Sequence, residues 1–174
     1  AGSDPEMPEL RAAGAQFVML DQAVTQLDLG AGAVGRALQG RAGPSRLDIA
    51  DPAFASFSFT PKGLGSRPLS PAHLSARREG GDLALRWIRR TRIGGDSWEL
   101  AETPLGEADE RYALDILDGA SVVRGVETTE PFFIYGAAEE ASDYGAAVST
   151  IRFRVAQLSR AFGRGAATEA ERHV

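Results

Sequence analysis

One stretch decides the fold: residues 112–119 read Tyr-Ala-Leu-Asp-Ile-Leu-Asp-Gly. Tyr112, Leu114 and Ile116 alternate with small or polar residues, which is the period-two pattern of a strand with one buried face. The Asp118-Gly119 pair that follows is a strong signal for a tight hairpin turn. The stretch therefore predicts a half-buried strand that turns back into an antiparallel neighbour.

Similar short segments, separated by turn residues, occur on both sides of this hairpin. They cover residues 72–77, 83–87, 121–126, 131–135, 151–155 and 166–174. Evenly spaced short strands over about 100 residues are the pattern of an immunoglobulin-like sandwich. We therefore predict an all-β fold, a β-sandwich over residues 71–174, with one helical turn at residues 137–143.

The alternation also predicts which side chains face the core. The inward set is Leu83, Leu85, Trp87, Tyr112, Leu114, Ile116, Ile151, Phe153 and Val155, and the outward set is Arg86, Asp115, Arg152 and Arg154. In such a sandwich the strands of Tyr112 and Ile151 are neighbours. We therefore expect Asp115 to pair with an arginine across the strands, as a device for solubility and register.

The residues before the sandwich predict a smaller, mainly-β module. Residues 1–6 are expected to be a cloning remnant, and residues 7–70 a small β-rich module with its linker at 61–71. Gln16–Leu20 predicts a buried strand, which could form a hairpin with Val24–Leu29. An amphipathic helix over Phe17–Leu29 is the competing interpretation. Ala53–Thr60 predicts another strand, because its phenylalanines alternate.

Composition excludes several classes of protein. The chain has 174 residues, a net charge of −5, two histidines and no cysteine. Disulfides, thiolate metal sites and a multi-histidine metal centre are therefore excluded, and no metal or other cofactor is expected. Mild acidity argues against a nucleic-acid partner. The sequence has no apolar run of the ~18 residues that a membrane span needs, so no membrane span is expected.

Several segments together resemble the C-terminal part of the tail hub, or baseplate, protein of siphophage-like particles, and most closely that of gene transfer agents. The resemblance rests on Phe17–Asp21, Leu27–Leu29, Pro68–Leu74, Leu83–Arg92, Gly95–Trp98, Pro104–Glu107, Tyr112, Ile116–Gly119, Phe153–Ser159 and Gly163–Gly165. It implies a structural part of a virion tail tip, made in the bacterial cytoplasm, whose partners are other tail and baseplate proteins.

Residues 71–165 also resemble a fibronectin type III domain. Trp87 matches the core tryptophan that this family has in its second strand, and Tyr112 matches the tyrosine of its third strand. The chain departs from the family at Ile151, where a tyrosine usually makes a corner hydrogen bond. That bond is therefore expected to be missing or replaced.

The segment Arg89–Arg111 is long for a sandwich loop, and long loops at a sandwich end often carry function. Its candidate ligand-binding residues are Arg92, Asp96, Trp98 and Glu99. A ring such as Trp98 with nearby Asp and Arg could bind a sugar, and a host-surface glycan is the alternative partner. Burial of Trp98 against the core or a neighbouring domain is the favoured interpretation, because most tryptophans are largely buried.

The patterns that would indicate an enzyme are weak. Gly30–Gly35 fits G-x-G-x-x-G, but Gly40 and Pro44 leave barely one or two turns for the helix of a dinucleotide site, so a flexible loop is the favoured interpretation. Carboxylates in the Arg89–Arg111 segment could suggest a glycosidase, yet nothing in the sequence sets their separation. Arginines at 86–92 and 152–154 could form a basic stripe for an anionic glycan or simply alternate on the solvent face. We therefore expect a non-enzymatic interaction module, with carbohydrate or receptor binding as the alternative.

Overall fold

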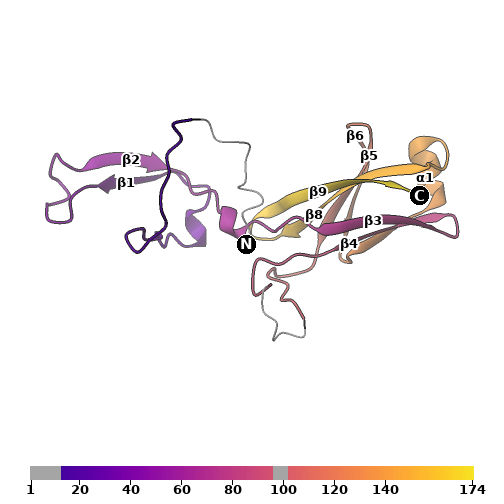
Figure 1. Cartoon of the computed structure of the whole chain (residues 1–174), viewed down its shortest axis with the longest axis horizontal. Coiled ribbons are helices and arrows are strands. Elements are labelled where there is room, and N and C mark those ends of the chain that lie inside the picture. The colour runs from indigo at the N-terminus through magenta and orange to yellow at the C-terminus, as the bar shows by residue number, and fades with distance from the viewer. Residues whose placement is uncertain (1–12, 96–101) are drawn as a thin grey trace. The chain divides into compact units, whose positions relative to one another are not determined.

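The computed structural model describes residues 13–95 and 102–174, and it divides into two compact units. The C-terminal unit begins at Ser66, and the N-terminal unit ends at Gly65 (Figure 1). The division therefore falls inside the proline- and glycine-rich segment 61–71.

The C-terminal unit is a sandwich of two antiparallel sheets. The smaller sheet has the order β3-β4-β7, formed by Ala72–Glu79, Asp82–Ile88 and Phe132–Tyr135. The larger has the order β6-β5-β8-β9, formed by Ser121–Thr128, Tyr112–Asp118, Thr150–Ser159 and Gly163–His173. This strand order is that of a fibronectin type III domain, so the predicted fold class is confirmed.

The register of the larger sheet places β5 at its centre. Leu114 pairs with Val126 of β6 on one side and with Val155 of β8 on the other. The predicted hairpin turn is present, and Gly119 has a φ of 57°, which favours glycine. Because β5 has a neighbour on each edge, its alternating side chains fix both the core and the outer face of this sheet.

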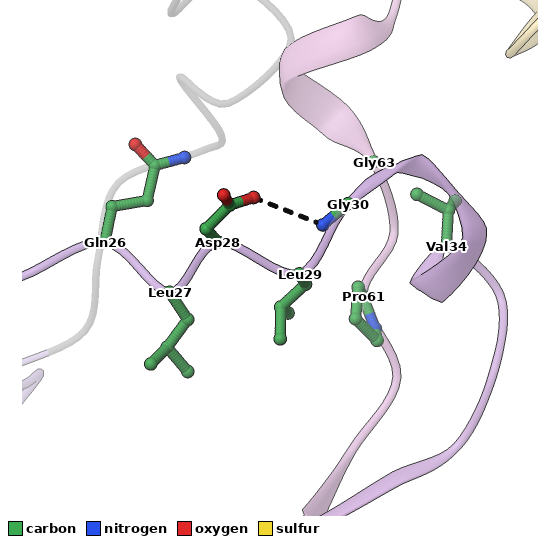
Figure 2. Close-up of a pocket in the computed structure, with 8 residues that line it drawn as sticks. All are labelled: Gln26, Leu27, Asp28, Leu29, Gly30, Val34, Pro61 and Gly63. Atoms are coloured by element: carbon green, nitrogen blue, oxygen red, sulfur yellow. Dashed lines mark hydrogen bonds between the residues drawn. The ribbon is translucent and has the colours of Figure 1, made fainter.

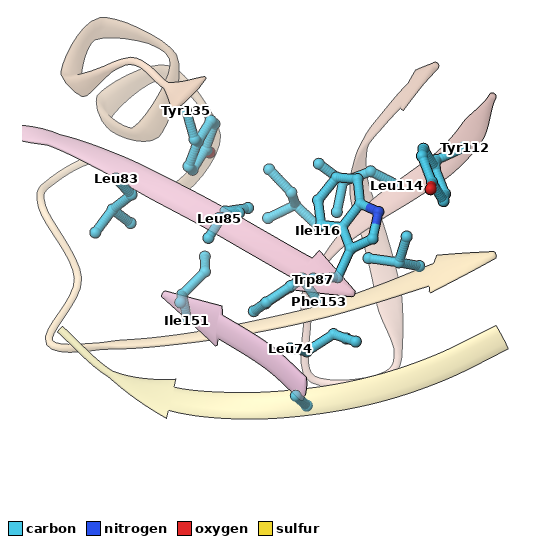
Figure 3. Close-up of a cluster of buried hydrophobic side chains, with 12 residues drawn as sticks. Leu74, Leu83, Leu85, Trp87, Tyr112, Leu114, Ile116, Tyr135, Ile151 and Phe153 are labelled. Atoms are coloured by element: carbon cyan, nitrogen blue, oxygen red, sulfur yellow. The ribbon is translucent and has the colours of Figure 1, made fainter. Parts of the chain in front are cut away.

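The core lies between the two sheets, and Figure 3 shows its side chains converging from both. All the residues predicted to face inward are buried, with exposures of 0–4%. Trp87 meets Tyr112 edge-on, with ring centroids 5.3 Å apart. Leu74 and Tyr135 complete the cluster from β3 and β7. The inward face of the sandwich is thus confirmed.

A short helix, α1 at Ala137–Tyr144, joins β7 to β8 and corresponds to the helical turn predicted at 137–143. Its first backbone N–H groups find side-chain acceptors: Gly136 donates to Glu139 and Ala137 donates to Asp82 of β4. Gly145 ends the helix with a φ of 81°. The helix is therefore fixed at its start to the strand beside it.

The described part of the N-terminal unit, residues 13–65, contains one small sheet. β1, Leu38–Ala42, pairs antiparallel with β2, Ala55–Phe59, which confirms the strand predicted at 53–60. The 3-10 turn η2 covers Ala31–Ala33, and η3, Leu64–Ser66, lies at the division between the units. Phe57 packs over Gly40, whose missing side chain leaves room for the ring.

The prediction for residues 16–29 was wrong. Gln16–Leu20 and Val24–Leu29 form neither a hairpin nor a helix, and Phe17 is 87% exposed rather than buried. A strand becomes buried only when a neighbour covers it, and the β1–β2 sheet does not pair with this segment. Local alternation carries no information about whether such a neighbour exists.

Candidate functional site

The loop between β4 and β5 holds the candidate ligand-binding residues of the sequence. Only Arg92 of that set is described; Asp96, Trp98 and Glu99 lie outside the described residues. Burial of the Trp98 ring therefore stays a prediction. What the structure does show is how the two limbs of this loop are held together.

Two arginines of the first limb bind the returning limb. The Arg89 guanidinium donates to the carbonyls of Thr103 and Pro104, both at 2.9 Å. Arg92 donates to the carbonyl of Gly106 at 3.2 Å and to the carboxylate of Glu107 at 2.8 Å. The side chain of Glu107 is only 7% exposed. Arg92 therefore braces the loop, whatever it contributes to a ligand.

The described carboxylates near this loop either bind different partners or face the solvent. Asp109 binds Arg160, and Glu110 accepts a hydrogen bond from the Tyr112 hydroxyl. Burial and the Glu110 carboxylate both raise the pKa of Tyr112 well above its usual value. Glu102 is exposed. These groups stabilise strand ends and loop limbs, so no acid and base pair of a glycosidase emerges from the described part of the loop.

A buried carboxylate that sequence reasoning missed lies in α1. Glu140 is fully buried, and both of its oxygens accept bonds from Arg78 of β3, at 2.9 and 3.0 Å. The Val148 backbone N–H adds a third bond at 2.7 Å. The hydrogen bond from Arg78 holds the pKa of Glu140 below its usual value, despite the opposing effect of burial. No sequence pattern indicated that this glutamate of an acidic pair turns inward.

The same corner contains a second ion pair. Asp143 of α1 accepts bonds from Arg124 of β6 and, at 2.7 Å, from the Tyr135 hydroxyl, and these bonds lower the pKa of Asp143. The hydroxyl of Tyr144 donates to the Leu117 carbonyl of β5. These contacts fix the connection between β7 and β8 where the family's tyrosine corner would be, while Ile151 is simply a core residue.

On the outer face of the larger sheet, the burial of Asp115 corrects the sequence-based prediction. It was predicted to be outward and solvent-facing, but it is only 7% exposed. The predicted cross-strand pair is confirmed, since Arg154 donates to it at 2.7 Å, and Arg164 of β9 adds a second bond at 2.6 Å. Burial alone would raise the pKa of Asp115, but the two guanidinium groups lower it below the usual value.

The arginines do not form one basic stripe. Arg86 lies on β4 of the smaller sheet, over the Phe132 ring. Arg152 and Arg154 lie on β8 of the larger sheet, where Arg152 pairs with Glu169. Arg86 and the pair of Arg152 and Arg154 therefore belong to different sheets, and Arg152 and Arg154 each have an acidic partner.

The histidines and the glycine motif offer no metal or nucleotide chemistry. His73 is exposed with a φ of 52°, at a bulge in β3, and His173 contacts Thr150. Gly30–Gly35 contains only the three-residue turn η2, and no helix follows it before β1. Within residues 13–95 and 102–174, no three His, Asp or Glu side chains are grouped to hold a metal ion.

A pocket of about 440 Å³ lies in the N-terminal unit (Figure 2). Leu27, Leu29, Val34 and Pro61 supply its apolar lining, and Asp28 is the only acidic residue among the described residues that line it. The Asp28 carboxylate points to the backbone N–H of Gly30, at 3.4 Å. The described lining thus has one carboxylate and no basic side chain, so it offers contact surface rather than catalytic groups. The described residues contain no helix long and apolar enough to cross a membrane.

No protein-family model matches the sequence, and no curated protein matches it. Among solved structures, domains d3-d4 of the rat CD45 extracellular region match 97% of this chain and 80% of theirs, with 11% identity and a TM-score of 0.45. The spore cortex lytic enzyme SleM of Clostridium perfringens matches 74% of this chain at 11% identity and a TM-score of 0.38. The glycoside hydrolase domain of Endo-D from Streptococcus pneumoniae R6 matches 79% of this chain, with 9% identity and a TM-score of 0.38.

The chain spans only 35% of the SleM chain and 26% of the Endo-D chain. These likenesses are weak, and the fold assignment rests on the strand order of the two sheets instead. Function must be argued from the surfaces and side chains of this chain.

Proposed function

We propose that this chain is a non-enzymatic structural and interaction module of the tail tip hub of a phage-like particle of the gene transfer agent type. Its partners would be other tail and baseplate proteins. It would be made in the bacterial cytoplasm and reside in the particle. The sequence resemblance to tail hub proteins supports the assignment to a particle, and the side chains of the sandwich support the scaffold role.

The observation that carries the scaffold role is the use of charged groups in the sandwich. Glu140, Asp143 and Asp115, whose pKa values are lowered, are each bound by arginines from other elements. Perturbed carboxylates also occur in active sites, but there they face a cleft. Here they bind strands and helix to one another, so these carboxylates stabilise the fold of the domain.

Immunogold electron microscopy of particles from the source bacterium tests the proposal. Antibodies raised against residues 66–174 should label the distal end of the tail in wild-type particles. Particles from a strain that lacks the gene are the control for specificity. Intact tailed particles that carry no label, in cells where the protein is present, would contradict the assignment to the tail tip.

One observation favours a second function, binding of a host-surface carbohydrate. Arg89 and Arg92 brace the limbs on both sides of residues 96–101, and braced long loops often carry binding sites. A glycan array probed with the whole chain tests this function. Binding should be lost in Trp98→Ala and kept in Trp87→Phe, and no signal above background for the wild type would rule the function out.

A further inference from the structure

The N-terminal unit exposes a long apolar segment that lies outside any helix or strand and is interrupted by a turn at residues 21–23. We call residues 16–29 the apolar strip. Phe17, Leu20 and Leu27 are 87%, 85% and 63% exposed. Scattered exposed apolar residues are normal, but a contiguous run rimmed by polar residues marks an interaction surface.

The backbone of the apolar strip is also left without a ladder. Among the described residues, its hydrogen bonds are local: Asp21 bonds to Met19, and Val24 and Ala23 bond to Asp21. Residues 16–18 and 25–27 donate to no described group. A segment outside any sheet, with unpaired N–H and C=O groups, is a template for adding a strand to another sheet.

The same unit presents a sheet that needs a further strand. β1 and β2 form a two-stranded sheet, which is marginal by itself in water. Leu38 and Phe59 pair across its apolar face, and Phe57 on that face is 43% exposed. Both outer edges of this sheet are unpaired among the described residues. The described part of the unit thus contains an unpaired apolar segment and a two-stranded sheet with two free edges.

The charges of these two parts are complementary. Residues 13–35 contain Asp21 and Asp28 and no lysine or arginine, a net charge of −2. Residues 36–65 contain four basic residues, Arg36, Arg41, Arg46 and Lys62, and two acidic ones, a net charge of +2. Arg36 and Lys62 lie just outside the ends of β1 and β2 that are paired at Leu38 and Phe59.

We propose that the occupant of this surface is a second copy of the chain. The apolar strip of each copy adds to the β1–β2 sheet of the other, so the contact is reciprocal. A two-fold dimer uses the same two surfaces twice and closes on itself. Pairing of strip with strip is disfavoured, because it would bring the aspartates of two copies together. This contact is independent of the assignment to a phage-like particle.

The oligomeric state of the whole chain tests the proposal. Sedimentation velocity and light scattering should give twice the 18.4 kDa mass of one chain at micromolar concentration, with dissociation on dilution. Two charge-reversal variants are compared with it. One carries Asp21→Lys with Asp28→Lys, and the other carries Arg36→Glu with Lys62→Glu. Each variant should associate at least tenfold more weakly than the wild type and should therefore have the mass of a monomer.

Mixing the two variants is the decisive step. Each strip then meets a sheet of opposite charge, so the mixture should again give the dimer mass. Glu130→Lys with Glu171→Lys, two exposed positions of the sandwich, is the matched control and should dimerise like the wild type. A wild type that is monomeric throughout, variants that dimerise equally well, or a mixture that stays monomeric would each overturn the proposal. Ill-defined aggregates that form equally in all variants would overturn it as well.

Discussion

At the scale of single residues, the sandwich is notable for carboxylates that are buried and fully paired. Glu140 accepts three hydrogen bonds and Asp115 accepts two from guanidinium groups. An ionised carboxylate is costly to bury unless such partners surround it. Removing the carboxylate or its partner should therefore cost far more than changing an exposed charge.

Glu140→Gln is the first prediction. The amide cannot pair with the Arg78 charge, which is left partly buried, so we expect a loss of about 3 kcal/mol in the free energy of unfolding. Urea denaturation at pH 7 measures it. Glu130→Gln, at an exposed position, should change stability by less than about 0.5 kcal/mol. Equal effects of the two substitutions would contradict the structural role of Glu140.

Gly165→Ala is the second prediction. A Cβ at this position would lie 2.8 Å from the Pro68 side chain and 2.9 Å from the carbonyl oxygens of Pro68 and Gln157. Backbone atoms cannot move aside as a flexible side chain can, so we expect destabilisation of about 1–3 kcal/mol. Gly125→Ala is the control, because its Cβ would meet only Asp115, at 3.8 Å. The measurement is thermal unfolding, and similar melting temperatures for both variants would count against the close contact.

At the scale of elements, the connections rather than the strands distinguish this sandwich. The β7–β8 connection is a helix fixed by ion pairs, and the β4–β5 loop is braced by arginines that bind backbone carbonyls. Sequence patterns place strands well because the signal is local. They do not reveal which arginine reaches which carbonyl, since those partners lie 14 and 15 residues away in the chain.

Arg89→Gln is a prediction for the β4–β5 loop. Glutamine is too short to reach both carbonyls, so the loop should open more often while the strands stay intact. Hydrogen exchange followed by mass spectrometry should show faster exchange over residues 103–107 and unchanged exchange in β5 and β8. Arg86→Gln, on the solvent side of β4, should leave the loop unaffected. Unchanged exchange in Arg89→Gln would mean that the brace contributes nothing.

At the scale of the whole molecule, the sandwich should lose stability as the pH falls. Asp115, Glu140 and Asp143 all have pKa values lowered by arginines in the folded state. Such groups stabilise the fold fully above their unfolded pKa values, about 4, and lose that contribution as pH falls through the lower folded values. Urea midpoints measured from pH 7 to pH 2 should therefore fall steeply below about pH 4. In Glu140→Gln the fall should be shallower, and an identical slope would contradict the assignment.

The two units should also differ in independent stability. Residues 66–174 enclose a complete core, so this fragment should unfold cooperatively with a melting temperature within a few degrees of the whole chain. Residues 13–65 have one two-stranded sheet and should show no cooperative transition as a fragment at low concentration. Circular dichroism against temperature measures both. A cooperative transition in the dilute 13–65 fragment would show that the small unit needs no partner.

The sequence by itself determined the strands of the sandwich and the residues of its core. Period-two alternation at Leu83–Trp87, Tyr112–Ile116 and Ile151–Val155 predicted the buried faces, because strand geometry sends successive side chains to opposite sides. The glycine at 119 predicted the hairpin turn for an equally local reason. These signals depend only on neighbours in the chain.

Tertiary structure alone decided which charged groups are buried and which apolar ones are exposed. Glu140 is buried because Arg78 of β3 meets it, and no local pattern predicts that contact. Asp115 was expected to pair with an arginine, but its burial on the outer face depends on two of them, Arg154 and Arg164. Phe17 and Leu27 stay exposed because no strand among the described residues of the unit covers them, although the segments they lie in are as apolar as core strands. Burial is a property of the partners a segment finds, and those partners lie far along the chain or in another molecule.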